Sequence, residues 1–349
     1  MKYIVIQGKK ISYGKKPFII AEAGVNHNGN LELALKLIDA AAFAGADAVK
    51  FQTFRAEQVV TTGGEMADYQ KRNLGKTESQ LAMLRKLELK EKFYPALIQR
   101  AKEQGIIFLS TPHGGFESVD FLQKMKVPAF KFGSGDLTNL PLLEYAAKFK
   151  KPMLISAGMS NLEEVKEAVA AIKKAGNNQI LVFQCTTDYP LAPENVHLRA
   201  MQTMMKELGV LVGYSDHTIG SQAAVMATAL GACMLEKHFT LDRNLPGPDQ
   251  AASMEPLEFK EMVRQIEKAM VILGSPKKRL LNCEKQYVKV ARKSLISARA
   301  IRKGEKFTVK NLTVKRPGTG ISPRRWKEVL GKQSKAKIKK DSLITEGMV

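Results

Sequence analysis

Two histidines, His217 and His238, stand 21 residues apart, and each follows a short apolar run that ends in polar residues. Residues 219–230 between them are rich in alanine and have a helical composition. This interval fits a strand, a crossover helix and the next parallel strand, so both imidazoles are expected at the same end of neighbouring strands. There they can bind a divalent metal and leave coordination positions for water and substrate. The alternative is two unrelated core or surface histidines, because no ligand signature is complete. The two histidines are placed alike, each near a carboxylate, and this match favours the metal site over two unrelated histidines.

Lys50 and Lys131 end two other apolar runs. A lysine at such a position can clamp an anion or act as a Schiff-base nucleophile. Hydroxyl groups from Thr111, Ser134 and Ser215 follow similar runs, and hydroxyls with two ammonium groups form a cradle for a phosphate and a carboxylate.

Glu22 ends the first apolar run and is the candidate acid or base beside the metal. Structural roles are the alternative for all of these residues. Lysines on strands can extend to solvent, Ser and Thr can cap helices, and Glu22 can simply pair with a lysine.

The elements that must position these residues are eight short runs of β-branched and aromatic residues. They alternate with helical stretches, as at 31–43, 94–104 and 162–175. The eight expected strands are 18–23, 48–53, 106–111, 129–133, 152–156, 179–185, 210–215 and 232–238. Eight repeats of this kind predict an α/β fold, a closed (β/α)8 TIM barrel, with its site at the carboxyl ends of the strands. A doubly wound open sheet is the alternative, but residues 23–29 lack its GxGxxG pattern.

The chain is expected to divide into a barrel domain at 1–275, a linker at 276–290 and a compact β-rich domain at 291–349. Residues 3–13 predict a β-hairpin before the barrel, placed to plug its floor. After residue 291 the expected strands are short and the turns frequent, so this small domain is expected to dock against a barrel.

The composition of the 349 residues bounds the function. Net charge is +21, with basic runs at 277–279 and 324–340, and suits nucleic acid, an anionic surface or anionic small substrates. No aromatic-interleaved basic stripe or helix-turn-helix pattern is found, so nucleic-acid binding is a minor hypothesis.

Three scattered cysteines without CxxC spacing indicate a reducing cytoplasm. No apolar run is long enough to cross a membrane, and the amino terminus lacks a secretory signal.

Taken together, these motifs resemble the sialic acid (N-acetylneuraminate) synthase family. The residues that carry the resemblance are 20–29, 49–53, 110–112, 131–135, 215–218, 236–242 and 246–249. The last domain, with Lys315-Arg316-Pro317-Gly318, is similar to that family's antifreeze-protein-like (SAF) domain, so the resemblance covers the chain essentially end to end.

The resemblance implies a metal-dependent condensation of phosphoenolpyruvate with the open-chain aldehyde of N-acetylmannosamine, which gives N-acetylneuraminate and phosphate by C–O cleavage. His217 and His238 would bind Mn²⁺, with Mg²⁺ or Co²⁺ as alternatives. Glu22 would guide a proton or water. The phosphate and carboxylate would be held by Lys50, Lys131, Thr111, Ser134 and Ser215.

The resemblance also implies how the sugar is held. Gln52, Tyr189 and Asp249 would contact it within the barrel. A domain-swapped homodimer is expected, in which Arg316 of one subunit reaches the sugar's N-acetyl group in the barrel of its partner.

Two positions depart from the sialic-acid pattern. Asp136 stands where a glutamate is usual, and Thr187 with Asp188 precedes Tyr189 where an asparagine is common. Asp136 and Thr187 are expected to face the substrate, so the sugar stays open. The close alternative is an N,N'-diacetyllegionaminate synthase that uses 2,4-diacetamido-2,4,6-trideoxymannose by the same mechanism. Pseudaminic acid fits less well. Two further alternatives are a Schiff-base aldolase and a basic module that binds anions or nucleic acid without catalysis.

Overall fold

The computed structural model describes residues 3–74 and 78–349, and the chain divides into two compact units, Met1–Gly274 and Ser275–Val349. The predicted end of the barrel domain, residue 275, lies next to this division. Each unit has its own hydrophobic core.

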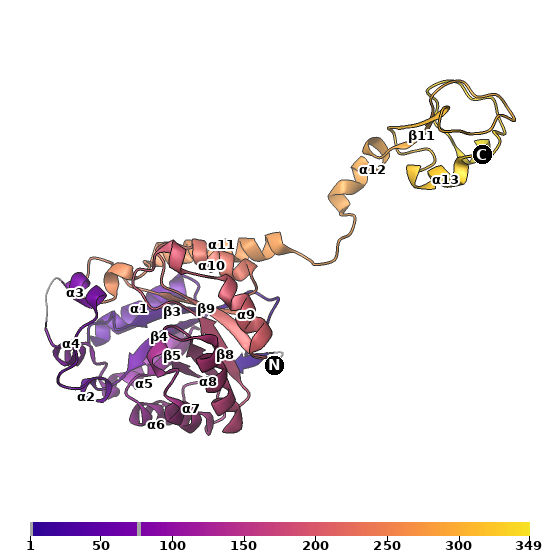
Figure 1. The fold of residues 1–349 in the computed structure, drawn as a ribbon. Helices are drawn as coiled ribbons and strands as arrows, with labels where there is room; N and C mark the ends of the chain where they lie inside the picture. Colours follow the sequence, from indigo (N-terminus) through magenta and orange to yellow (C-terminus); the bar gives the residue numbers. More distant parts are fainter. Residues whose placement is uncertain (1–2, 75–77) are drawn as a thin grey trace. The chain divides into compact units, whose positions relative to one another are not determined.

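Eight parallel strands form the first unit's sheet (Figure 1). Their bounds are β3 Phe18–Gly24, β4 Ala48–Thr53, β5 Ile107–Pro112, β6 Phe130–Phe132, β7 Met153–Ser156, β8 Ile180–Gln184, β9 Leu211–Asp216 and β10 Met234–His238. The hydrogen-bonded order is β5-β4-β3-β10-β9-β8-β7-β6, so the last strand pairs with the first, and β5 contacts β6. This confirms the predicted (β/α)8 barrel and rules out the open doubly wound sheet.

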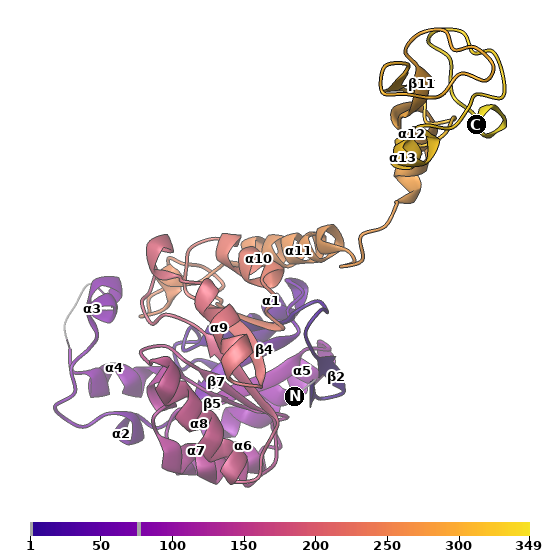
Figure 2. The same ribbon diagram turned by 45° about the vertical axis from the view of Figure 1, so that its right-hand side comes forward.

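Helices surround these strands, and α7 packs beside α8 as α10 does beside α11 (Figures 1 and 2). The helices of this unit are α1 Leu31–Phe43, α2 Ala56–Val59, α3 Asp68–Leu74, α4 Gln80–Leu87, α5 Tyr94–Glu103, α6 Phe116–Lys124, α7 Leu140–Ala147, α8 Leu162–Lys174, α9 Arg199–Glu207, α10 Gln222–Ala229 and α11 Pro256–Leu273. The helices α2, α3 and α4, which were not predicted from the sequence, lie in the long connection after β4.

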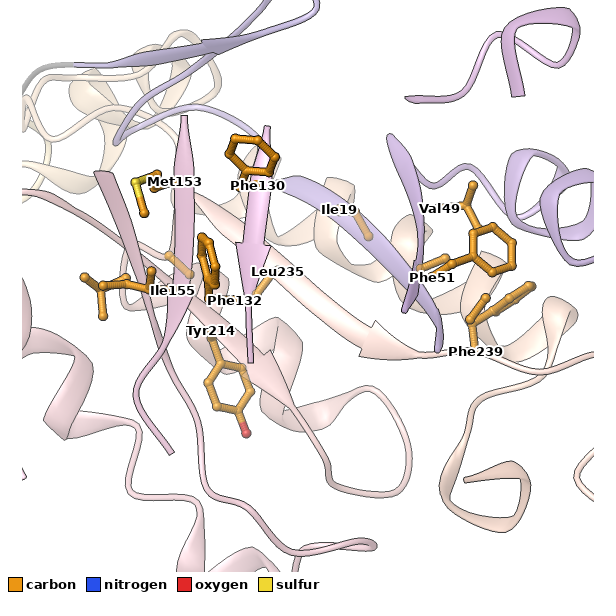
Figure 3. Close-up of a cluster of buried hydrophobic side chains, with 14 of the residues drawn as sticks. Ile19, Val49, Phe51, Phe130, Phe132, Met153, Ile155, Tyr214, Leu235 and Phe239 are labelled. Carbon is orange, nitrogen blue, oxygen red and sulfur yellow. The ribbon is translucent and has the colours of Figure 1, made fainter. Parts of the chain in front are cut away.

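Alternation of side chains along each strand separates the core from the site. One set of apolar strand side chains, which includes Val49, Phe51, Phe130 and Phe132 (Figure 3), belongs to the buried cluster that the strands share with the surrounding helices. Truncation of such a fully buried phenylalanine costs about 3–5 kcal/mol. The residues between these apolar positions, such as Lys131, therefore face the interior of the barrel.

The inside of the barrel is apolar where the strands begin. There β1, Ile4–Ile6, and β2, Lys9–Ile11, form an antiparallel hairpin within the predicted range 3–13. Ile6 and Ile11 belong to one buried cluster with Phe18, Leu109 and Leu181 from the barrel strands. The hairpin therefore closes this end, and the polar interior lies at the other.

The second unit is built from short pieces. They are η5 Asn282–Glu284, α12 Lys285–Ala291, an antiparallel pair of β11 Ser294–Ser297 with β12 Leu312–Lys315, η6 Pro323–Arg325, α13 Trp326–Val329 and η7 Glu346–Met348. Its core includes Leu295, Phe307 and Ile344. Helix α12 occupies part of the predicted linker. Residues 275–349 contain 22 Lys and Arg but 5 Asp and Glu, so most of the net positive charge lies in this unit.

Among the described residues, no helix is both long and apolar enough to cross a membrane.

Candidate active site

A cavity of about 240 Å³ opens at the carboxyl ends of the barrel strands. Twelve of the fourteen residues predicted from the sequence line it: Glu22, Lys50, Gln52, Thr111, Lys131, Ser134, Thr187, Tyr189, Ser215, His217, His238 and Asp249. The other two are Asp136, beside the cavity, and Arg316, in the second unit.

Strand pairing explains why these residues converge. Glu22 on β3 is the register partner of Lys50 on β4, and Ser215 on β9 is the partner of Glu236 on β10. Residues two apart on a strand face the same side, so Glu236 and His238 share the barrel interior. His217 follows the last residue of β9 and lines the same cavity as Ser215.

The centre of the cavity is a buried cluster of two lysines and two glutamates. Lys50 Nζ lies 2.6 Å from Glu22 Oε2 and donates to Thr111 Oγ1 at 3.0 Å. Lys131 Nζ lies 3.3 Å from Glu236 Oε1. All four charged side chains are at most 5% exposed, and ions buried this deeply require partners of opposite charge.

Hydroxyl groups complete the cluster. Lys131 Nζ donates to Ser156 Oγ at 2.7 Å, and Ser215 Oγ donates to Glu236 Oε1 at 3.1 Å. Ser134 Oγ accepts a hydrogen bond from the Gly158 amide and lies 3.3 Å from Cys185 Sγ. The arrangement offers ammonium and hydroxyl donors to an anionic substrate.

The two glutamates differ in their affinity for protons. Burial raises the pKa of Glu22 to about 7, against the opposing effect of Lys50. Burial acts in the same direction on Glu236, but Lys131 and Lys50 outweigh it and lower its pKa to about 2. One carboxyl group can therefore exchange a proton near neutral pH while the other stays ionised, a division typical of acid–base sites.

Burial also acts on the two ammonium groups. It lowers the pKa of Lys131. For Lys50 the effect of burial is outweighed by Glu22 and Glu236, which raise the pKa. Lys50 is therefore held in its charged form.

Glu236 and Ser156 were not among the predicted site residues. Glu236 could have been found from its position two residues before His238 on a strand, which places both side chains on the same face. Ser156 ends the fifth barrel strand and could have been found by the same rule that selected Thr111 and Ser134.

The two histidines adjoin this cluster, with ring centroids 5.4 Å apart. His217 Nδ1 lies 2.6 Å from the Thr186 carbonyl oxygen. A carbonyl oxygen only accepts, so Nδ1 carries the proton and Nε2 keeps a free lone pair for a metal. His238 Nδ1 is buried and has no hydrogen-bond partner in the described part of the chain. Burial lowers the pKa of both imidazoles and keeps them neutral, the form that binds metals.

This donor set fits a divalent ion bound by two protein ligands. Within residues 3–74 and 78–349 no group of three or more His, Cys, Asp or Glu side chains is arranged to hold a metal. The remaining ligands would come from water and substrate, as an open catalytic site requires.

The other side of the cavity has groups suited to a sugar. The Tyr189 ring lies 4.2 Å from the His217 ring, between centroids. Gln52 Nε2 lies 3.5 Å from Glu22 Oε1, and burial raises the pKa of Asp249 to about 6. Thr187 Oγ1 is buried and, among the described residues, has no hydrogen-bond partner.

One wall of the cavity is apolar. It is formed by five residues from the loop after β3 and from the segment that holds α2 and α4: Val25, Val59, Met83, Leu84 and Leu87. This wall was not predicted from the sequence, because it brings together residues that are far apart in the chain.

Asp136 follows β6 and contacts the cavity through a neighbour. Its Oδ2 lies 4.0 Å from Nδ1 of His113, which lines the cavity. Arg316 follows β12 in the second unit, so its contact with a partner's sugar stays a prediction.

Comparison with known proteins decides the family. The NeuB family matches residues 37–278, and the SAF domain matches residues 292–349. The chain belongs to the NeuB family. It is 47% identical to the N,N'-diacetyllegionaminic acid synthase of Campylobacter jejuni over 95% of this chain and 100% of that protein. It is 38% identical to the human N-acetylneuraminate-9-phosphate synthase over 96% of this chain and 94% of that one.

A solved structure gives the same result. The N-acetylneuraminic acid (sialic acid) synthetase of Leptospira borgpetersenii, in complex with citrate, superposes with a TM-score of 0.73 at 32% identity, over 82% of this chain and 95% of that one. The predicted family and its SAF domain are confirmed. This NeuB family member is therefore an enzyme, a transferase of the phosphoenolpyruvate-dependent nonulosonic acid synthase type.

Proposed function

We propose that the enzyme condenses phosphoenolpyruvate with open-chain 2,4-diacetamido-2,4,6-trideoxymannose to give N,N'-diacetyllegionaminate and phosphate. The reaction uses a divalent metal ion, for which Mn²⁺ is the first candidate. The observation that carries the proposal is the buried cluster of Lys50, Lys131, Glu22 and Glu236 beside His217 and His238. It combines a cradle for an anion, a carboxyl group that can exchange a proton, and a metal-binding pair.

Two observations favour this sugar. The relative named for legionaminic acid is 47% identical, against 38% for the human N-acetylneuraminate-9-phosphate synthase. The apolar wall of Val59, Met83, Leu84 and their neighbours suits a methyl group at carbon 6 better than a hydroxymethyl group, because a buried hydroxyl without a partner is costly. N-acetylmannosamine, which the sequence resemblance places first, becomes the second candidate.

The residues have separate tasks in the reaction. Lys50, Lys131 and the hydroxyls around them hold the phosphate and carboxylate of phosphoenolpyruvate, while Tyr189 and Asp249 orient the sugar. A divalent ion bound by His217 and His238 would polarise a carbonyl oxygen as a Lewis acid.

The bond changes follow from this placement. Carbon 3 of phosphoenolpyruvate attacks the aldehyde carbon, and the aldehyde oxygen takes a proton. Water adds to the oxocarbenium carbon 2 and loses a proton, for which Glu22 is the nearby acceptor. The C–O bond to phosphate then breaks, and the hydroxyl on carbon 2 gives its proton to the leaving phosphate, which leaves the keto acid and inorganic phosphate.

The Schiff-base aldolase is less well supported. Lys50 is paired with Glu22 at 2.6 Å, and the carboxylates raise its pKa, which disfavours the neutral amine that a nucleophile requires. Lys131 is the better candidate, because burial lowers its pKa. Trapping of a pyruvate adduct on Lys131 by borohydride would support the aldolase.

A homodimer is part of the proposal. The segment 271–290 exposes several large apolar residues: Val271, Ile272, Leu273, Leu280, Leu281, Tyr287 and Val290. Apolar side chains gathered in one segment favour a protein interface. They support a second copy of the chain as the partner, with Arg316 as the residue that would reach the partner's barrel.

The test is a reaction of the purified full chain with phosphoenolpyruvate, Mn²⁺ and each sugar in turn. We expect phosphate release and a nine-carbon keto acid, with kcat/KM at least about tenfold higher for the diacetamido-trideoxy sugar. Phosphoenolpyruvate labelled with ¹⁸O in the bridging position should release labelled phosphate. Unlabelled phosphate would contradict C–O cleavage, and a preference for N-acetylmannosamine would contradict the choice of sugar.

A further inference from the structure

Strands β9 and β10 carry a second buried ion pair, on the side of the sheet opposite the cavity. Lys237 Nζ lies 2.8 Å from Asp216 Oδ2, and the two side chains are 3% and 1% exposed. The residues are register partners across the ladder between β9 and β10. Asp216 immediately precedes His217, and Lys237 immediately precedes His238.

The ion pair is also bonded to the residue that follows His217. Asp216 Oδ1 accepts hydrogen bonds from the Thr218 amide at 2.9 Å and from Thr218 Oγ1 at 2.8 Å. Lys237 Nζ donates to the Thr218 carbonyl oxygen, and Tyr214 OH donates to Asp216 Oδ1 at 3.2 Å. The residues on both sides of His217 are therefore bonded to one another and to β10.

These bonds restrict how far the two imidazoles can move apart. A slip of β9 against β10 would separate Asp216 from Lys237 and leave buried charges without partners, which is strongly unfavourable. Beyond Asp216 the chain leaves β9, and the backbone of His217 is held by the Thr218 bonds on one side and by the hydrogen bond from the Leu191 amide to its own carbonyl oxygen, 2.8 Å, on the other. His217 Nδ1 is in turn bonded to Thr186 on its other side.

We propose that Asp216 and Lys237 are positioning residues that hold His217 and His238 at the separation needed to bind one divalent ion. The inference rests on the metal site proposed above. Neither residue touches the substrate: the pair acts through the backbone of β9 and β10 and the turn at Thr218. Supports that fix the orientation of metal ligands commonly contribute tenfold or more to metal affinity.

The test measures Mn²⁺ affinity of the metal-stripped full chain, by calorimetry and by the electron paramagnetic resonance signal of free Mn²⁺. The variant is Asp216→Asn with Lys237→Met, which removes both charges together and avoids an unpaired buried ion. We expect its Mn²⁺ dissociation constant to rise at least about tenfold.

The matched control is Asp39→Asn with Arg100→Met. It removes an ion pair between α1 and α5, in which Arg100 Nε and Asp39 Oδ1 are 2.6 Å apart. The control should keep wild-type Mn²⁺ affinity whatever its melting temperature.

Each outcome decides a separate point. Wild-type Mn²⁺ affinity in a folded double variant would overturn the positioning role and leave the metal site intact. Absence of Mn²⁺ binding in the wild-type protein would overturn the metal site and this inference with it. If circular dichroism shows that the double variant is unfolded, Thr218→Val removes one bond to Asp216 and keeps both charges paired. That variant should also bind Mn²⁺ more weakly, and unchanged affinity would overturn the proposal.

Discussion

Glu22 and Lys50 form a buried ion pair between neighbouring parallel strands, with Oε2 and Nζ 2.6 Å apart at register-paired positions. Despite this cation, burial holds the pKa of Glu22 at about 7. The pair therefore places an exchangeable proton beside the ammonium group that is expected to hold an anion.

Glu22→Gln should lower kcat by about 10²- to 10⁴-fold, the usual contribution of a positioned acid or base. The amide keeps the shape and can still meet Lys50 and Gln52, so KM for phosphoenolpyruvate should change far less than kcat. Steady-state kinetics measures both constants. A large rise in KM with unchanged kcat would instead identify Glu22 as a binding group.

Removal of the metal should abolish activity. Treatment with EDTA followed by desalting is expected to give an inactive wild-type enzyme that Mn²⁺ restores. His217→Ala should lose at least about 100-fold in kcat and stay inactive at the Mn²⁺ concentration that restores the wild type. Activity that is indifferent to chelators would favour the Schiff-base aldolase, particularly if borohydride traps a pyruvate adduct.

Asp249 should make sugar binding depend on pH. Burial raises its pKa to about 6, and a carboxylate accepts hydrogen bonds from sugar hydroxyls better than a neutral carboxyl group does. KM for the sugar is therefore expected to rise as the pH falls below about 6. Asp249→Asn should raise KM at pH 8 and remove this dependence. A pH profile that persists in the variant would assign the titration to another group.

The same carboxyl group should lower stability at high pH. Its folded-state pKa lies above the ordinary value of 3.8, so its stabilising contribution is complete below about pH 4 and is lost as the pH rises through about 6. At pH 8 Asp249→Asn should raise the free energy of unfolding by on the order of 1–3 kcal/mol. Urea denaturation at pH 4 and pH 8 measures the free energy of unfolding of the variant and of the wild type. Gln52→Glu adds a carboxyl group to the same cavity and is the control for the effect of a charge at this place.

Mixed subunits test the role of Arg316. Arg316→Ala and His217→Ala should each be nearly inactive alone. If Arg316 completes the partner's site, a refolded equal mixture should regain about a quarter of wild-type activity, because half of the dimers are mixed and each has one intact site. No recovery, together with dimers seen by ultracentrifugation, would place Arg316 in its own subunit's site or outside the site.

The apolar wall should set the preference for a 6-deoxy sugar. Leu84→Asn introduces an amide that can bond a hydroxyl, so the ratio of kcat/KM between the diacetamido-trideoxy sugar and its 6-hydroxy counterpart should fall by about 10-fold or more. Leu84→Met keeps the wall apolar and should leave the ratio nearly unchanged. Equal ratios in the two variants would exclude this wall from sugar selection.

The barrel strands could be predicted from the sequence because each is a buried apolar run that ends at polar residues. The expected strand 48–53 and β4 coincide, and the others differ by two residues or fewer at either end. The helices α2 and α4 could not be predicted in the same way. They are short, and their stability comes from packing of residues such as Leu81 and Met83 against Phe54 and Val25.

Asp216 and Glu236 show where sequence reasoning about the site stopped. They are the carboxylates near His217 and His238 in the sequence, and the spacing by itself places neither of them in the site. The structure separates them: Glu236 faces the cavity and pairs with Lys131, whereas Asp216 faces outward and pairs with Lys237. Strand parity could have made this distinction once the strands were accepted.

By itself the sequence determined the barrel, the rim on which the polar residues gather, and the family, because periodicity and motif spacing are local properties of the chain. The tertiary structure decided which carboxyl group exchanges its proton near neutral pH, which ion pair lies behind the histidines, and where the apolar wall stands. These properties depend on desolvation and on charges brought together from different strands. Burial outweighs Lys50 and raises the pKa of Glu22, whereas Lys131 and Lys50 outweigh burial and lower the pKa of Glu236.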